Sequence, residues 1–179
     1  MRVVLVGGAP GVGKTTVARL LLHIAARGES LVQWVDVDAL WLHQPWRVDE
    51  LTKRMVQSNL AAVMTNALTA GVDVLVVTWV FQSPDLHALV RRLAPQDASI
   101  ETIQLLVDET TWRARVGSAG DRPAIDSFYI DRYLGAQSTP ADCSIDTTSL
   151  DPQSVAEVLA AALGLVRPGD RPEEYQPAP

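Results

Sequence analysis

The sequence predicts an α/β protein whose strands form a parallel sheet. Short β-branched runs alternate with amphipathic helical segments along the chain, which is the pattern of βαβ units. A glycine-rich turn lies directly between the first run, residues 3–6, and the first helical stripe, which consists of Val17, Leu20, Leu21 and Ile24. The 179 residues are 47% hydrophobic and 20% charged, which suits one globular domain with a single core.

The turn between the first strand and the first helix reads GAPGVGKT and matches G-x-x-x-x-G-K-[ST], the P-loop pattern. Its glycines let the backbone curl so that N–H groups point toward phosphate oxygens, and the following helix adds its N-terminal dipole. Lys14 is expected to reach the β- and γ-phosphates, and the Thr15 hydroxyl is expected to ligate Mg²⁺. The expected nucleotide-binding residues are Gly8, Ala9, Pro10, Gly11, Val12, Gly13, Lys14, Thr15 and Thr16. The flanking strand and helix disfavour the alternative, a glycine-rich turn without a ligand.

Composition and charge exclude several classes of partner. A net charge of -6 gives no support to nucleic-acid binding, which needs a basic surface. No apolar run approaches the ~20 residues needed to cross a bilayer, and the first strand begins too close to Met1 for a signal peptide. Cys143 is the one cysteine, which excludes an intramolecular disulfide and suits a reducing compartment. We therefore expect a cytoplasmic protein without nucleic-acid or membrane partners.

Two aspartates follow the second predicted strand, residues 31–35. The first helix is expected to end near Arg27, and the strand then leads into Asp36 and Asp38. Because ligands gather at the carboxyl ends of parallel strands, both aspartates are expected at the same rim as the P-loop. Their spacing of two on an extended chain predicts that both carboxylates point the same way. The alternative is that Asp38 only caps the next helix.

An aromatic stretch, residues 39–47, follows the aspartates. Its tryptophans, Trp41 and Trp46, either form an apolar wall for a substrate or pack against the next helix, and the sequence leaves both open. That helix is expected over residues 49–69, with a stop at Gly71.

The third predicted strand, residues 73–78, is almost wholly apolar and is therefore expected at the centre of the sheet. Many P-loop proteins carry an acidic Walker B residue at the end of this strand, whereas Thr78 and Trp79 stand here. The difference argues against a motor protein or a GTPase, and no N-K-x-D motif for guanine occurs. It also moves the expected metal ligands to Thr15 and the two aspartates.

The second half of the chain continues the alternation. Helices are expected at residues 84–93, from 108, at 125–136 and from 151, and strands at 100–107 and 143–146. His87, on the first of these helices, is expected at the surface. Arg113, Arg115 and Arg122 belong to a stretch that is expected to close over a triphosphate as a mobile lid, or else to be a solvated charged loop. Residues 167–179 are rich in proline and are expected to form a tail.

The chain resembles the small P-loop kinases of the shikimate kinase and nucleoside monophosphate kinase type, and is most similar to the chloramphenicol phosphotransferase group. The parts that carry the resemblance are the P-loop, residues 37–40 after the second strand, residues 120–122 in the lid and residues 145–148 before the last helix. It covers nearly the whole folded part, so residues 1–166 are expected to form one kinase domain with a lid at about residues 113–123.

The resemblance implies a three-layer α/β/α fold with five parallel strands in the order 2-3-1-4-5. It implies ATP as the phosphoryl donor, Mg²⁺, and a small hydroxylated acceptor. It also implies that Asp38 is the general base, that Asp36 helps to hold Mg²⁺ and that Arg122 contacts the phosphates. Implied nucleotide contacts further along the chain are Arg115, on adenine, and Thr147. The expected acceptor-binding residues are Asp36, Asp38, Trp41, Trp46, Trp79 and Arg132, of which Arg132 is one residue out of the family's register.

Together these expectations describe an ATP-dependent phosphotransferase that moves the γ-phosphate to a hydroxyl of a small molecule, antibiotic-like or a metabolite. Lys14, Mg²⁺ and Arg122 would stabilise the transferred phosphoryl group. One alternative is a nucleoside or nucleotide kinase, in which Arg47 or Arg54 would bind the acceptor phosphate. Another is a non-catalytic nucleotide-binding module, which the missing Walker B carboxylate motivates. The sequence identifies neither the acceptor nor the oligomeric state, and a homodimer is left open.

Overall fold

The sheet of this protein is central, and the first strand lies in its middle. The computed structural model describes residues 1–118 and 125–166. Within them, five parallel strands form one sheet in the order β2-β3-β1-β4-β5, as the resemblance implied. The strands are β1 (Arg2–Gly8), β2 (Val32–Asp36), β3 (Val74–Thr78), β4 (Ser99–Leu106) and β5 (Cys143–Asp146).

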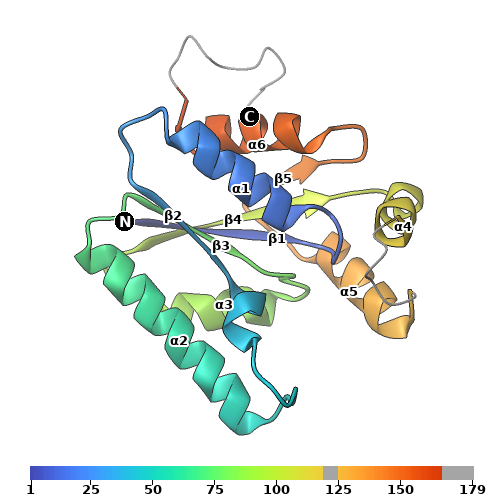
Figure 1. Cartoon of the computed structure of the whole chain (residues 1–179), viewed down its shortest axis with the longest axis horizontal. Helices are drawn as coiled ribbons and strands as arrows, with labels where there is room; N and C mark the ends of the chain where they lie inside the picture. Colours follow the sequence, from blue (N-terminus) through green and yellow to red (C-terminus); the bar gives the residue numbers. More distant parts are fainter. Residues whose placement is uncertain (119–124, 167–179) are drawn as a thin grey trace.

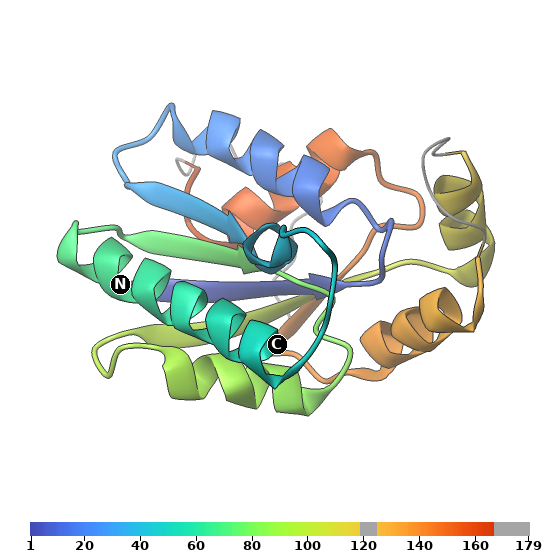
Figure 2. The same ribbon diagram turned by 60° about the horizontal axis from the view of Figure 1, so that its bottom comes forward.

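Helices cover both faces of the sheet, so the expected three-layer architecture is confirmed. α1 (Lys14–Ala25) and α6 (Pro152–Ala162) lie on one face, and α2 (Glu50–Thr69) and α3 (Pro84–Leu93) on the other (Figures 1 and 2). α4 (Glu109–Gly117) and α5 (Ser127–Ser138) lie beyond the carboxyl end of the sheet (Figure 1). The P-loop opens at the same end.

The central strands are buried on both faces because their side chains alternate between two apolar cores. Val4 and Val76 belong to the core under α1 and α6, whereas Leu5 and Leu75 belong to the core under α2 and α3. All four are 0% exposed. This two-sided burial explains why the strands read as continuous apolar runs in the sequence.

A short 3-10 helix, η1 (Val37–Trp41), follows β2, where an extended chain was expected to carry both aspartates. The Asp36 side chain accepts a hydrogen bond from the Asp38 backbone N–H at 3.0 Å and so starts this helix. The prediction of an extended chain from Asp36 to Asp38 is therefore wrong, because the chain turns directly after Asp36. The residue that caps is Asp36, and Asp38 lies within the helix.

The prediction that His87 lies at the surface is also wrong. The side chain is 6% exposed and its ring lies 4.8 Å from that of Phe81, centroid to centroid. His87 precedes the buried Val90 by three residues, so both face the sheet.

Two expectations fall on residues outside the described part of the chain. Arg122, which was predicted to belong to the lid, and the predicted tail at residues 167–179 both lie there. Across the described residues, no helix combines the length and apolar character needed to span a membrane.

Candidate active site

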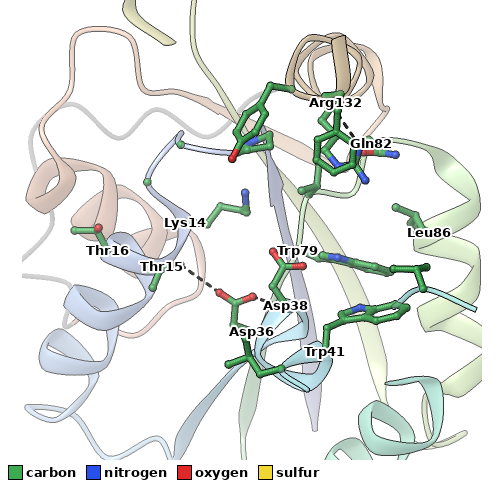
Figure 3. A pocket seen from close by; sticks show the side chains of 18 of the residues that line it. Lys14, Thr15, Thr16, Asp36, Asp38, Trp41, Trp79, Gln82, Leu86 and Arg132 are labelled. Carbon is green, nitrogen blue, oxygen red and sulfur yellow. Dashed lines mark hydrogen bonds between the residues drawn. The ribbon is translucent and has the colours of Figure 1, made fainter. Parts of the chain in front are cut away.

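A cavity of about 640 Å³ lies at the carboxyl ends of β1, β2 and β3, between the P-loop and an aromatic wall (Figure 3). Five separate parts of the chain contribute to it: the P-loop with the first turn of α1, the segment after β2, the β3–α3 turn, the start of α3, and α5. The lining residues are Pro10, Gly11, Gly13, Lys14, Thr15, Thr16, Asp36, Asp38, Trp41, Leu42, Trp46, Val48, Trp79, Val80, Gln82, Leu86, Phe128, Tyr129 and Arg132.

Three P-loop residues, Gly8, Gly11 and Gly13, have a positive φ that favours glycine. Gly8 has a φ of 146°, and a Cβ there would lie 2.9 Å from the carbonyl oxygen of Leu105. Gly13 has a φ of 110° and is the N-cap residue of α1. Both conformations are rare for residues with a Cβ. The side chain of Lys14 folds over the loop, and its Nζ donates to the carbonyl oxygens of Gly8 at 2.7 Å and Ala9 at 3.0 Å.

The N-terminus of α1 opens into the cavity. Gly13 supplies no side-chain cap, and the first turn carries no acidic residue. Lys14, Thr15 and Thr16 of this turn line the cavity, and the turn itself brings no carboxylate there. Such a helix end favours a bound anion, since its dipole is positive there.

Asp36 connects the P-loop helix to η1. Its Oδ2 accepts a hydrogen bond from the Thr15 hydroxyl at 3.2 Å, while its Oδ1 accepts from the Asp38 N–H. A hydroxyl oxygen beside a carboxylate suits Mg²⁺, which is commonly held by one or two protein oxygens together with water and substrate phosphates. The residues present thus fit the expected magnesium site.

The pKa of Asp38 is raised in the cavity. Burial raises the pKa of its carboxyl, and the nearby charge of Asp36 raises that pKa further. Lys14, a hydrogen bond from the Trp79 side chain and Arg132 act in the opposite direction. Figure 3 shows the Asp38 carboxylate between Lys14 and Trp79. A carboxylate with a raised pKa, held in a cavity, can accept a proton from a hydroxyl.

The end of β3 carries no metal ligand. The Thr78 hydroxyl accepts a hydrogen bond from the Trp34 indole N–H at 2.9 Å, and the side chain is 0% exposed. Thr78 thus ties the ends of β2 and β3 together and does not line the cavity.

The β3–α3 turn presents Trp79 and Gln82 to the cavity (Figure 3). Between them, Phe81 has a φ of 43°, a left-handed conformation that is unusual for a bulky residue. Its buried ring packs edge-on against Trp79, with the centroids 5.9 Å apart. Strained backbone of this kind is concentrated at functional sites. Nothing in the sequence pattern indicated Gln82.

The expected acceptor-binding side chains come together in this cavity. Trp41, Trp46, Trp79 and Arg132 all line it. Trp41 also packs against the core under α2, so it fits both alternatives, whereas Trp46 is 58% exposed. Arg132 stacks on Phe128, with its guanidinium carbon 3.3 Å from the ring centroid. Phe128 was not predicted, although its position four residues before Arg132 on one helix face could have indicated it.

The two further residues expected to contact the nucleotide, Arg115 and Thr147, contact each other outside this cavity. Arg115 donates to the Thr147 hydroxyl at 3.0 Å and to the Thr147 carbonyl at 2.6 Å. The contact joins α4 to the loop after β5. Neither residue lines the cavity, so their roles toward a nucleotide stay predictions.

Trp112 links α4 to the P-loop, a contact that the sequence did not indicate. Its buried indole N–H donates to the carbonyl oxygen of Pro10, in the P-loop, at 2.7 Å. The same ring stacks on Tyr133 of α5, with centroids 4.4 Å apart. α4 and α5 are thereby fastened to the P-loop.

Comparison with known proteins identifies the fold. No protein-family model matches the chain, and no curated protein matches it in sequence. A sugar kinase from Janibacter sp. HTCC2649 superposes with a TM-score of 0.68 and 17% identity over 97% of this chain and 99% of that one. The tunicamycin resistance protein of Deinococcus radiodurans gives 0.67 and 20% over 92% and 96%. The APS kinase CysC of Mycobacterium tuberculosis, solved with AMPPNP and APS, gives 0.65 and 20% over 91% and 97%.

These similarities define the class of the fold: it is that of the small P-loop kinases. The resemblance inferred from the sequence is confirmed at this level. The particular similarity to chloramphenicol phosphotransferases stays a prediction.

Proposed function

We propose that the protein transfers the γ-phosphoryl group of ATP to a hydroxyl of a small acceptor molecule. The observation that carries the proposal is Asp38, a carboxylate of raised pKa that faces Lys14 within a cavity joining the P-loop to an apolar wall. The shared fold with kinases of small molecules supports the same reading. Use of ATP suits the cytoplasmic location expected from the sequence.

The reaction forms one bond and breaks another. The acceptor oxygen bonds to the γ-phosphorus, the bond from that phosphorus to the bridging oxygen of ADP breaks, and the acceptor proton passes to the Asp38 carboxylate. Since the transition state is loose, most of the rate enhancement comes from positioning and charge stabilisation. Lys14 and the loop N–H groups stabilise charge on the phosphates, and the proton transfer contributes roughly 10²–10⁴-fold.

Thr15 and Asp36 would hold Mg²⁺, which when bound neutralises charge on the β- and γ-phosphates. Arg115 and Thr147 are proposed to contact the nucleotide. Arg122 is proposed to stabilise the transferred group, although it lies outside the described residues.

The nucleotide kinase alternative finds less support. Arg47 pairs with Asp49 at 3.3 Å, and Arg54 donates to the Glu50 carbonyl oxygen at 3.2 Å. Neither arginine lines the cavity, so neither is placed to bind an acceptor phosphate there.

A product search tests the proposal. The protein is incubated with ATP, Mg²⁺ and a panel of hydroxylated metabolites and antibiotics, and mass spectrometry detects any acceptor that gains a phosphoryl group. We expect such a product with the native chain and none with Asp38→Asn above the background. Binding of ATP without any phosphorylated acceptor would instead favour the non-catalytic module.

A further inference from the structure

Exposed apolar side chains gather at the mouth of the candidate active site. The described residues include eight large hydrophobic side chains that are exposed. Four of them line the cavity: Leu42 at 81%, Trp46 at 58%, Val48 at 57% and Phe128 at 53% exposed. Apolar surface clustered in a concave site marks a ligand-binding groove more often than chance exposure does.

The acceptor side of the cavity offers few polar partners. Apart from the P-loop, α1 and the two aspartates, its hydrogen-bonding side chains are Gln82, Tyr129, Arg132 and the three tryptophans, each with one indole N–H, of which Trp79 bonds to Asp38. Arg132 has one face of its guanidinium group on Phe128. A polyol would place several hydroxyls against aromatic and aliphatic side chains, and a buried hydroxyl without a partner is costly.

The apolar wall is built before any ligand binds. The Trp46 ring stacks on His43 at 5.4 Å and tilts against Trp41 at 6.2 Å between centroids. His43 Nε2 lies 3.1 Å from the Arg47 carbonyl oxygen, a hydrogen-bonded distance. A wall that is already ordered loses little entropy when a ligand binds.

We propose that the acceptor is a mainly apolar, ring-bearing alcohol whose ring lies against Trp41 and Trp46 while its hydroxyl reaches Asp38. This inference rests on the proposed function and adds the substrate class. A small molecule fits better than a second copy of the chain, because one continuous concave surface joins the wall to the Asp38 carboxylate and to Lys14. The occupant must therefore reach both.

Binding can be measured apart from phosphoryl transfer. The probe is anilinonaphthalene sulfonate, an aromatic anion that fluoresces in apolar sites, and phenylpropanol and glycerol are tested as competitors. We expect phenylpropanol to displace the probe and glycerol not to. A phosphate ester should form, in the presence of ATP and Mg²⁺, from phenylpropanol at a higher rate than from glycerol.

Three variants locate the binding site. Leu42→Ser and Trp46→Ala each remove exposed carbons from the wall and should weaken probe binding about fivefold or more. Leu31→Ser is the matched control, because Leu31 is also exposed, at 52%, but precedes β2 at the opposite end of the sheet from the cavity. That variant should bind the probe within about twofold of the native chain.

Each outcome has a distinct meaning. Equal or better competition by glycerol, or unchanged probe binding in both wall variants, overturns the inference. So does a dimer that Leu42→Ser dissociates, since a second copy would then cover the wall. Site-specific displacement by phenylpropanol without any ester from the whole panel supports the apolar site and contradicts the proposed function.

Discussion

Asp36 and Asp38 are neighbours with different surroundings, and this difference separates the roles proposed for them. Asp36 accepts hydrogen bonds from the Thr15 hydroxyl, at the P-loop, and from the Asp38 backbone N–H. Asp38 lies between Lys14 and the Trp79 side chain, and its pKa is raised. The first suits a metal-side group and the second a proton acceptor.

Their asparagine variants should therefore fail differently. Asparagine keeps an acceptor oxygen but takes up no proton at neutral pH. We expect Asp38→Asn to bind ATP normally and to lose phosphoryl transfer by roughly 10²–10⁴-fold. Asp36→Asn should keep the start of η1 but need more Mg²⁺, and excess metal should restore part of the rate. Steady-state rates across a Mg²⁺ titration measure both, and a fully active Asp38→Asn would rule out its role as base.

His87 should make stability depend on pH. Burial, and then the charge of Arg91, lower the pKa of this histidine in the folded state below its usual 6.5, while Asp142 acts in the opposite direction. Above pH 6.5 neither state is protonated at His87, so it contributes no pH dependence there. As the pH falls below 6.5, the unfolded state binds a proton that the folded state does not, and stability decreases by up to about 1.4 kcal/mol per pH unit.

A leucine variant isolates this effect. Between pH 6.5 and 5, His87→Leu should lose less free energy of unfolding than the native chain, as measured by urea denaturation. His23→Leu, at an exposed site on α1, is the matched surface substitution. Parallel profiles for the native chain and His87→Leu would show that His87 is protonated in the folded state.

At the residue scale, the sequence predicted which residues line the candidate site better than it predicted their contacts. The P-loop residues and Asp38 were predicted because the motif and the strand end define them. The burial of His87 was missed although its spacing from Val90 indicated it. The place of Gln82 in the cavity could not be predicted, because it depends on the left-handed turn at Phe81.

At the scale of elements, α4 is fastened to the P-loop through one hydrogen bond, from Trp112 to the Pro10 carbonyl oxygen. We expect Trp112→Phe to keep the buried ring, to lose this bond and to weaken ATP binding about three- to tenfold. Calorimetric titration with ATP and Mg²⁺ measures the change.

Trp34→Phe is the matched control. It also removes one indole hydrogen bond, to Thr78, but at the edge of the sheet. Both variants should lose about 1 kcal/mol of stability, whereas only Trp112→Phe should change ATP affinity. Equal ATP affinities in the two variants would contradict a link between α4 and the P-loop.

Elements themselves were predictable where periodicity is strong. α3 spans Pro84–Leu93 and β5 spans Cys143–Asp146, as expected. The 3-10 helix after β2 was not predictable, because it depends on the hydrogen bond that the Asp36 side chain accepts from the Asp38 N–H. Two aspartates that are two residues apart fit an extended chain equally well.

At the scale of the whole molecule, alternation along the chain predicted a parallel sheet, but the strand order came only from the resemblance. The cavity could not be predicted as a whole. It joins residues from the P-loop to Arg132, which are neighbours only because β1 lies between β3 and β4 and because α5 lies beyond the end of the sheet. The sequence pattern within a single helix or strand carries no information about which other elements lie beside it.

ATP binding should stabilise the folded molecule as a whole, and the two lysines of the chain, Lys14 and Lys53, offer a matched test. At a hundredfold excess over its dissociation constant, ATP with Mg²⁺ should add about 2.7 kcal/mol of stability, a rise in Tm of roughly 5–10 °C for a chain of this size. Lys14→Ala should still unfold cooperatively without ligand. It should lose most of the rise in Tm with ATP, because the substitution removes the lysine of the proposed phosphate site. Lys53→Ala, whose side chain pairs with Glu50 at 2.8 Å on the surface of α2, should keep the rise in full. Thermal unfolding of the three proteins with and without ATP and Mg²⁺ measures it, and an undiminished rise in Lys14→Ala would remove the P-loop lysine from nucleotide binding.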